Sequence, residues 1–518
     1  MKTLLDKILV VLLVLFVSVI LAVSVRGLLG NPTASQLSDL KWRENGPFEL
    51  SPERGRFALL YSMAEDKSLT FSTEIGKFAE PDVAVSNGKY VSLFAPLVSF
   101  VAYPGYIIGK YFGASQVGTF ATVAVFGLLN MMLIRQIVIR MGGTKAAATI
   151  AGLVFLFATP AFAYAVNLYQ HHLSTFLILF STYALLKFRK IPALIAVFFL
   201  CATAIPLDYP NLFFLFPLGA YAFSQIFSFE KVRERLSFGI SFYKFLTLFI
   251  MILPILFFVG FNKASYNNPF QLSGTLQSVK DIEGRKDAAT IAAAKNIKQH
   301  ETAPKKTAIA LFRTRNMLNG FYILLLSPDR GIIYYAPIVL FGIGGFLIAL
   351  KKKAKLVGVL AAIIGANLLL YSMWGDPWGG WAFGARYLIP SYAALSIFTG
   401  ILLSFWNKKI LFLAFFVPVA LYSIAVNSLG AITTSAMPPQ VEVLALEKAT
   451  GTVQKYTYER NWDMLVSGNS KSFVYQTFVR GYLGSVQFYI LIVTSVSLLI
   501  IGLIGFNYFK YKKGGYNV

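Results

Sequence analysis

Twelve apolar runs of roughly bilayer-spanning length are the feature that most constrains how this chain can fold. A helical crossing needs about 20 mostly apolar residues. Only helices and closed barrels can pair every backbone polar group within lipid. The runs are Ile8–Leu29, Gln116–Ile139, Ala146–Val166, Leu173–Leu186, Ile191–Leu207, Leu212–Phe227, Phe245–Phe261, Ile332–Leu350, Leu356–Met373, Leu388–Phe405, Ile410–Leu429 and Ser485–Phe506. They predict an all-α polytopic membrane protein of about twelve transmembrane helices.

Composition supports the membrane class and argues against a soluble one. Charged residues make up 14% of the 518 residues and hydrophobic residues 56%, whereas soluble domains carry about 25% charged residues. A net charge of +24 would suggest a nucleic-acid partner in a soluble chain. Because the apolar content dominates here, we expect membrane lipids as partners and no nucleic acid. The single cysteine, Cys201, can form no intramolecular disulfide, so cysteine content does not indicate the redox compartment.

Charge distribution decides whether a thirteenth run, Val91–Phe112, crosses the bilayer. If it does not, the predicted cytoplasmic pieces hold 21 of the 47 lysines and arginines, with only Asp6, Glu230 and Glu234 as acids. If it does, 19 of those 21 basic residues move outside, against the positive-inside rule. We therefore predict that Val91–Phe112 is a juxtamembrane helix on the outer face and that both termini are cytoplasmic. The first run is interpreted as a retained signal anchor.

These expectations divide the chain into three parts. Residues 1–430 form a transmembrane module with a first outer loop at 30–90, the juxtamembrane helix at 91–112 and a second outer loop at 262–330. Residues 431–482 form a further outer segment, and residues 483–518 form the last transmembrane helix and a basic tail. Within the second outer loop, the alanine-rich stretch Asp287–Gln299 is typical of a helix.

The first outer loop contains the acidic residue that most invites a chemical role. Pro52 predicts a helix start, with Ser51 as its N-cap and Glu53 in the first turn. A glutamate there can simply complement the helix dipole. Arg56 lies at i+3 from Glu53, and such a neighbour is expected to lower the pKa of the carboxyl and keep it ionised. An ionised carboxylate suits a general base, so structural and catalytic interpretations both stay open.

Other polar residues gather at the predicted outer ends of the spans. They are Asp82, Lys89, Tyr90, His171, His172, Asp208, Arg330, Trp381, Arg386 and Tyr387. Tryptophan and tyrosine at this depth are typical of an interfacial belt. Adjacent histidines on a helix point about 100° apart, so they are poor ligands for one metal. Arg330 and Arg386 suit either lipid headgroups or a bound phosphate.

Known cofactor motifs are missing from the sequence. We find no Walker loop, Rossmann glycine pattern, zinc-type Cys/His spacing or G-x-S-x-G elbow. No cofactor is evident, and a divalent metal is possible but unsupported. A donor substrate is therefore expected to arrive through the lipid phase.

Several short strings resemble the GT-C class of membrane glycosyltransferases. Glu53-Arg54-Gly55-Arg56-Phe57 is similar to a D/E-x-x-R-[YF] pattern of that class. Gly88-Lys89-Tyr90-Val91-Ser92 with Ala95-Pro96 also resembles the class, as do the strings around Arg330 and from Trp378 to Tyr387. The similarity is to aminoarabinose transferases, protein O-mannosyltransferases and families 39 and 83. Many members have Asp at the Glu53 position and a lysine at the Ala95 position, for which Lys89 is the nearest substitute.

The resemblance implies a GT-C-like bundle and a specific reaction. A sugar would pass from a polyprenyl-phosphate donor to a hydroxyl of a lipid, polysaccharide or protein, at the outer face of the cell membrane and with inversion. Glu53 would be the general base, with Asp82 the next candidate, and Arg330 or Arg386 would hold the leaving phosphate. The remaining outer residues, Arg56, Lys89, Tyr90, His171, His172, Asp208, Trp381 and Tyr387, would contact substrate. A transporter, flippase, or polysaccharide polymerase or ligase is the alternative, which charged residues in mid-span would favour.

Overall fold

The computed structural model describes residues 2–40, 42, 46–232, 235–279, 282 and 312–513. The stretch Asp287–Gln299, predicted as a helix, lies outside the described residues. Each of the twelve predicted runs is helical over most of its length, which confirms the predicted helical class. Six helices of the described part are long and apolar enough to cross a membrane. The crossing of every individual run stays a prediction.

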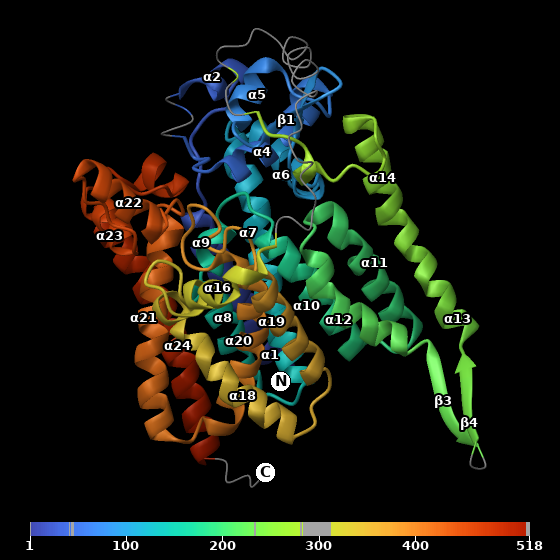
Figure 1. Cartoon of the computed structure of the whole chain (residues 1–518). Helices are drawn as coiled ribbons and strands as arrows, with labels where there is room; N and C mark the ends of the chain where they lie inside the picture. The colour runs from blue at the N-terminus through green and yellow to red at the C-terminus, as the bar shows by residue number, and fades with distance from the viewer. Residues whose placement is uncertain are drawn as a thin grey trace.

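A tall bundle of helices forms the body of the protein (Figure 1). Its longer helices are α1 (Lys2–Ser24), α7 (Ser115–Arg140), α8 (Lys145–Phe157), α10 (His171–Lys187), α11 (Ile191–Leu207), α12 (Asn211–Ser224), α14 (Ile252–Tyr266), α18 (Phe341–Lys351), α19 (Val357–Ser372), α20 (Ile389–Trp406), α21 (Ile410–Ile432) and α24 (Ser485–Lys513). Shorter ones are α9 (Ala161–Ala165), α13 (Phe242–Phe245), α16 (Met317–Leu325), α17 (Ile332–Tyr335), α22 (Gln440–Thr450) and α23 (Glu459–Val466).

A smaller apical unit, residues 31–112, covers one end of the bundle (Figure 1). It contains α2 (Ala34–Ser38), α4 (Ser51–Tyr61), α5 (Thr73–Ala79), β1 (Val83–Ser86), β2 (Lys89–Ser92) and α6 (Leu97–Tyr111). The two strands pair antiparallel, and the turn between them places Asn87 and Gly88 at φ 49° and 76°, which an Asn-Gly hairpin turn requires. The helix expected over Val91–Phe112 therefore begins only at Leu97, because Val91 and Ser92 belong to the hairpin.

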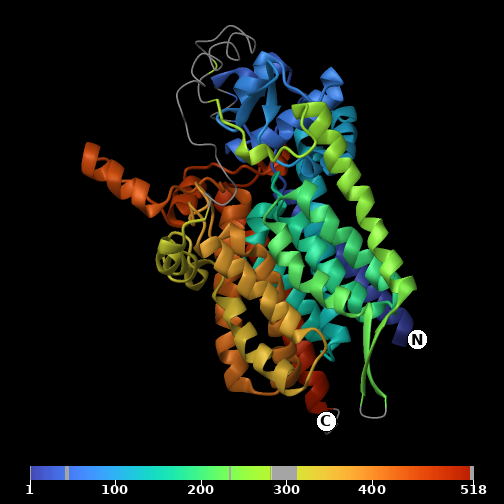
Figure 2. The ribbon, with the colours of Figure 1, turned by 45° about the vertical axis from the view of Figure 1, so that its right-hand side comes forward.

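Both described chain ends lie at the end of the bundle opposite the apical unit (Figure 2). Lys145, which opens α8, forms an ion pair with Asp6 of α1 at that end. The second hairpin, β3 (Phe227–Val232) with β4 (Arg235–Ile240), hangs from the same end. The two ends therefore lie on one side of the bundle, and the placement of both termini in the cytoplasm stays a prediction.

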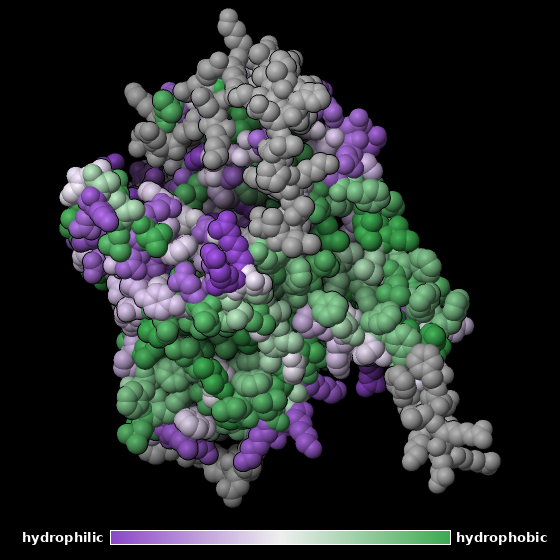
Figure 3. All heavy atoms as spheres, viewed as in Figure 1, coloured by the Kyte–Doolittle hydropathy of each residue, from purple (hydrophilic) through white to green (hydrophobic). Residues whose placement is uncertain are grey.

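On the face shown in Figure 3, a broad band of hydrophobic residues covers the bundle, with hydrophilic residues gathered above and below it. Phe216 and Phe415, for example, are each 71% exposed. Large exposed apolar surface of this kind suits lipid rather than water. The chain is a membrane protein.

Helices α8 and α20 are among the most deeply buried of the bundle. Helix α8 is buried along most of its length, and 83% of the most apolar stretch of Arg386–Trp406, which includes α20, is buried.

Helix α6 packs closely on α7 because each helix has glycine residues at the contact. A methyl group on Gly105 would overlap the hydroxyl of Thr122 and the carbonyl of Gly118. The apical unit is thereby held against α7.

Candidate active site

Glu53 supplies the N-terminal cap of α4 with its own side chain. Its Oε2 accepts hydrogen bonds from the backbone N–H groups of Glu49 (3.0 Å) and Leu50 (3.3 Å). The N-cap is therefore Leu50 rather than the predicted Ser51, because the carboxylate of a residue inside the first turn reaches back to the free N–H groups. The helix start at Pro52 was correctly predicted to within one residue.

The Glu53 side chain is shielded from solvent, and one of its carboxylate oxygens has no hydrogen-bond partner among the described residues. The side chain is fully buried, and Oε1 accepts no hydrogen bond from any described residue. The pKa of Glu53 is raised to about 7, chiefly by burial and also by the charge of Glu49, while Arg26 and the two backbone N–H groups oppose the rise. The predicted lowering by Arg56 is wrong, because Arg56 turns to other partners and burial dominates.

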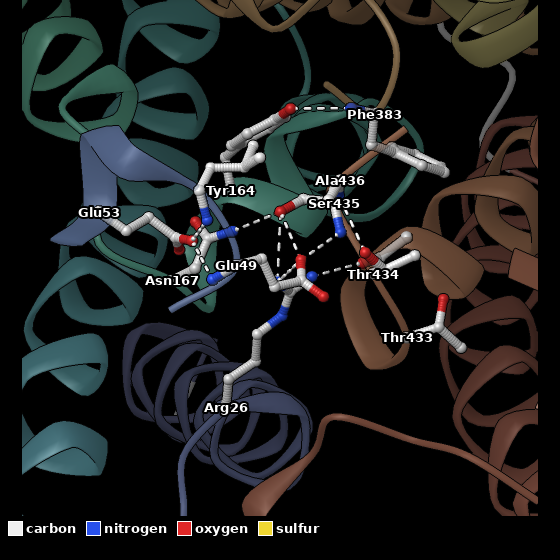
Figure 4. A network of polar contacts seen from close by, with 12 residues as sticks. Arg26, Glu49, Glu53, Tyr164, Asn167, Phe383, Thr433, Thr434, Ser435 and Ala436 are labelled. Atoms are coloured by element: carbon white, nitrogen blue, oxygen red, sulfur yellow. Dashed lines mark hydrogen bonds and ion pairs between the residues drawn. The ribbon is translucent and has the colours of Figure 1, made fainter. Parts of the chain in front are cut away.

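Glu49 is the second carboxylate of the site, and sequence reasoning missed it. Its Oε2 meets Arg26 Nη1 at 2.7 Å and also accepts the backbone N–H (2.8 Å) and the hydroxyl (3.1 Å) of Ser435 (Figure 4). Burial would raise the pKa of Glu49, but Arg26, Lys471 and these hydrogen bonds hold it below the ordinary value. Glu49 is therefore ionised at neutral pH.

Arg56, at i+3 from Glu53 in α4, belongs to a chain of polar contacts. Its Nη1 donates to the carbonyl of Pro52 (3.0 Å) and its Nη2 to Gln170 Oε1 (2.7 Å). Gln170 Nε2 in turn donates to Asp208 Oδ2 at 3.2 Å. The guanidinium carbon lies 4.5 Å from the ring centre of Phe94. The structure thus brings two of the predicted residues, Arg56 and Asp208, together through a glutamine that the sequence analysis did not single out.

Tyr169 joins Arg56 to a second buried arginine, Arg386. Its ring centre lies 5.8 Å from the guanidinium carbon of Arg56 and 4.9 Å from that of Arg386. The ring of His171 stacks on Tyr169 with centroids 5.7 Å apart. Burial raises the pKa of Tyr169 well above its ordinary value, and the nearby charge of Glu53 raises it too. The two arginines and His171 therefore pack around one phenol, and the charge of Glu53 acts on it.

This arginine pair carries positive charge without a matching ion pair. Arg386 is 8% exposed, and only its Nη2 binds a carbonyl, that of Gly379 at 2.7 Å. Its Nε and Nη1 lie against the rings of Tyr169 and Tyr387 and bind no carbonyl or carboxylate of the described residues. Within the described ranges neither Arg56 nor Arg386 forms an ion pair. Two buried like charges kept this close favour an anion between them.

Arg330 and His172 are committed to backbone groups. Arg330 is fully buried and donates to the carbonyls of Trp378, Asp329, Gly380 and Met437 at 2.7–3.0 Å. His172 Nε2 lies 2.7 Å from the carbonyl of Ala161. The bonds of Arg330 use four of its five N–H groups. Both side chains thus have structural partners, and neither belongs to the arginine pair around Tyr169.

The remaining predicted residues lie at different distances from this centre. Tyr387 stacks face to face on Tyr371, with centroids 4.1 Å apart, beside Arg386. Asp82 is half-buried, and its charge acts on Arg56. Lys89 is exposed on β2, and Tyr90 packs against Gly76 inside the apical unit. Trp381 is 37% exposed and donates to Glu442 Oε2 at 2.7 Å. Asp82 and Tyr387 thus border the site, and the other three lie apart from it.

Histidine, cysteine and carboxylate side chains do not gather in groups of three that could hold a metal ion anywhere in the described ranges. His171 and His172 also face different partners, as their adjacency on a helix predicts.

Three comparisons with known proteins complete the description. No protein-family model matches the sequence, and no curated protein does. Among solved structures, the chain is similar to ArnT from Cupriavidus metallidurans bound to undecaprenyl phosphate, with 14% identity, a TM-score of 0.46, and coverage of 97% of this chain and 76% of that one. It is also similar to the Archaeoglobus fulgidus oligosaccharyltransferase, with 15% identity, a TM-score of 0.40, and coverage of 90% and 55%.

Proposed function

We propose that this chain transfers a sugar from a polyprenyl-phosphate donor to an acceptor hydroxyl. One observation carries the proposal: the phenol that joins a buried pair of arginines also feels the charge of a fully buried carboxyl whose pKa is about 7. A general base works best when its pKa is near the working pH. Buried guanidinium groups suit a phosphate that gains charge as it leaves. The resemblance in sequence to GT-C transferases supports the same reaction.

Each step of the reaction has a group to perform it. The acceptor oxygen attacks the anomeric carbon and forms the new glycosidic bond, while the bond from that carbon to the phosphate oxygen breaks on the opposite face. The acceptor proton passes to Glu53, whose Oε1 has a free lone pair. The polyprenyl phosphate leaves with the bonding electrons and is stabilised by Arg386 and Arg56. The anomeric configuration is inverted because a single displacement occurs.

The position of the site favours chemistry at the outer membrane face. Glu53 and Arg56 lie in the apical unit, and the basic loops lie at the other end of the bundle, where the positive-inside rule puts the cytoplasm. Lys89 and Lys408 are exposed at these two ends. A Lys89→Cys variant should react with a membrane-impermeant maleimide in intact cells and a Lys408→Cys variant should not. The parent chain with Cys201 alone is the control, and labelling of Lys408→Cys from outside would contradict the assignment.

A donor panel tests the reaction itself. Purified full-length chain in liposomes is incubated with radiolabelled polyprenyl-phosphate sugars and with native membranes as the source of acceptor. The proposal predicts that at least one donor loses its sugar and releases polyprenyl phosphate, and that Glu53→Gln abolishes the loss. If no donor is consumed while a donor or its polyprenyl phosphate moves between leaflets, the chain is a flippase and the proposal is wrong.

A further inference from the structure

We propose that Glu49 is a positioning residue, clamped by Arg26 and Ser435, that fixes where the carboxylate of Glu53 lies. The inference rests on the proposed function, in which Glu53 accepts the proton. Glu49 does not touch the reacting atoms in this scheme and acts only through Glu53.

The clamp joins three segments that are far apart in the sequence (Figure 4). Arg26 follows the end of α1, Glu49 precedes α4, and Ser435 follows the end of α21. Arg26 is fully buried, and beyond Glu49 its donors reach Ser435 Oγ at 3.2 Å and the carbonyl of Gly430 at 3.0 Å. The Glu49 side chain is only 7% exposed. An arrangement so completely enclosed leaves the glutamate little freedom to move.

The position of Glu49 is passed to Glu53 through the backbone. The N–H of Glu49 itself donates to Glu53 Oε2, and the N–H of the next residue, Leu50, donates to the same oxygen. When Ser435 and Arg26 hold the Glu49 side chain, they therefore also hold the two N–H groups that orient the Glu53 carboxylate. Such orientation matters because a misplacement of about 1 Å can cost about 10²-fold in rate.

The segment that holds Glu49 also reaches the loop before Arg386. Beyond Ser435, the carbonyl of Met437 accepts hydrogen bonds from Ala382 N–H (2.9 Å) and from Arg330 Nη2 (2.8 Å). Asn461 anchors the other end of the segment by donating to Thr433 Oγ1 at 2.9 Å and to the carbonyl of Thr434 at 2.7 Å. One short segment, residues 433–437, thus fixes the base on one side and supports the arginine loop on the other.

Charge gives the clamp a second effect that a measurement can detect. The charged and titratable groups that act on Glu53 are Arg26 from the end of α1, Glu49 from the preceding loop and Tyr169 from the loop before α10. Neutralising Glu49 removes a negative charge that raises the pKa of Glu53 and leaves Arg26, which lowers it, without its carboxylate. Both changes favour ionised Glu53. A Glu49→Gln variant should therefore titrate Glu53 at lower pH.

The test follows the protonated carboxyl of Glu53 directly. Infrared difference spectra of the full chain in detergent are recorded against pH, and the Glu53 band is identified by its loss in Glu53→Gln. In the wild type, Glu53 should titrate near pH 7. In Glu49→Gln it should titrate about one pH unit or more lower, which is a tenfold change in proton affinity. In Glu49→Asp it should titrate close to the wild-type value. Glu74→Gln is the matched control, because Glu74 is an exposed glutamate in the first turn of α5.

Ser435→Ala keeps the proposal testable if Glu49→Gln fails to fold, because it loosens the clamp without leaving a buried charge alone. We expect its kcat to fall about tenfold and its donor KM to stay within about twofold. If Glu49→Gln, or Ser435→Ala in its place, leaves the titration and turnover of the wild type unchanged, the inference is wrong. If no donor is consumed by any variant but the titration still shifts, the proposed function fails and the link from Glu49 to Glu53 stands.

Discussion

Glu49 and Glu53 stand four positions apart in the sequence, and only the first of them is bound by a charged side chain among the described residues. Glu49 Oε2 meets the guanidinium of Arg26 at 2.7 Å, whereas Glu53 Oε2 meets, among the described residues, only the backbone N–H groups of Glu49 and Leu50. The charged partner holds the pKa of Glu49 down, and burial raises the pKa of Glu53 to about 7. Two neighbouring carboxylates with pKa values moved in opposite directions are a common basis for acid–base chemistry.

The raised pKa of Glu53 predicts a pH-dependent loss of stability. The folded state prefers the protonated carboxyl, so its contribution is fully present below the unfolded pKa of 4.5 and is lost as the pH rises through about 7. The loss approaches about 3 kcal/mol of unfolding free energy. The glutamine of Glu53→Gln cannot ionise. The melting temperature of this variant should therefore rise relative to that of the wild type as the pH increases from 5 to 8. If the melting temperatures of the two proteins change with pH by the same amount, the assigned pKa is wrong.

Arg386 is predicted to bind the donor phosphate. Its Nε and Nη1 are free of carbonyl and carboxylate partners in the described part of the chain. We expect Arg386→Ala to lower kcat/KM for a lipid-linked donor by about 10²-fold, and Arg386→Lys by less, since the lysine keeps the charge but not the fork of donors. Steady-state kinetics with the donor found in the panel measure this. Unchanged turnover in both variants would make Arg386 a headgroup contact.

Arg330 should behave differently although it is also a buried arginine. Because its donors bind four backbone carbonyls, Arg330→Lys is expected to lose at least about 2 kcal/mol of stability while the donor KM stays near the wild-type value. A melting curve and the same kinetic assay measure the two effects. A large rise in donor KM without a loss of stability would indicate that Arg330 binds the donor phosphate.

Gly55 is predicted to be needed for the placement of Arg56. A methyl group at Gly55 would lie 2.7–2.8 Å from ring atoms of Phe94, the ring that packs on the Arg56 guanidinium. Alanine favours a helix over glycine by about 1 kcal/mol, so Gly55→Ala should lower transfer several-fold without a matching loss of stability. Gly260→Ala is the control, because that helical glycine has open space around it. Wild-type transfer by Gly55→Ala would show that Phe94 and Arg56 adjust freely.

Much of the fold was predictable from the sequence because apolar runs and proline positions act locally. The runs became helices, and Pro52 correctly marked the start of α4. The juxtamembrane helix was predicted too long, since the Asn87–Gly88 turn that pairs β1 with β2 was not recognised.

The site was only partly predictable because its decisive contacts are long-range. Arg26 was hidden inside the first apolar run, and Glu49 stands just before the recognised pattern, so only the folded chain brings them to Ser435. Gln170 and Tyr169 sit next to the histidines that were noticed, and their polarity beside a span end was an available signal. The direction of the Glu53 pKa shift was missed because spacing along a helix reports neighbours but not burial.

The transfer activity of Glu53→Gln tests the central claim most directly. Purified wild type, Glu53→Gln, Glu53→Asp and the control Glu74→Gln are compared for sugar transfer from a lipid-linked donor and for binding of that donor. The account predicts that Glu53→Gln loses at least about 10²-fold in transfer but binds the donor normally, that Glu53→Asp keeps partial activity, and that Glu74→Gln matches the wild type. Near wild-type transfer by Glu53→Gln would contradict the account and make Asp82 the next candidate for the base.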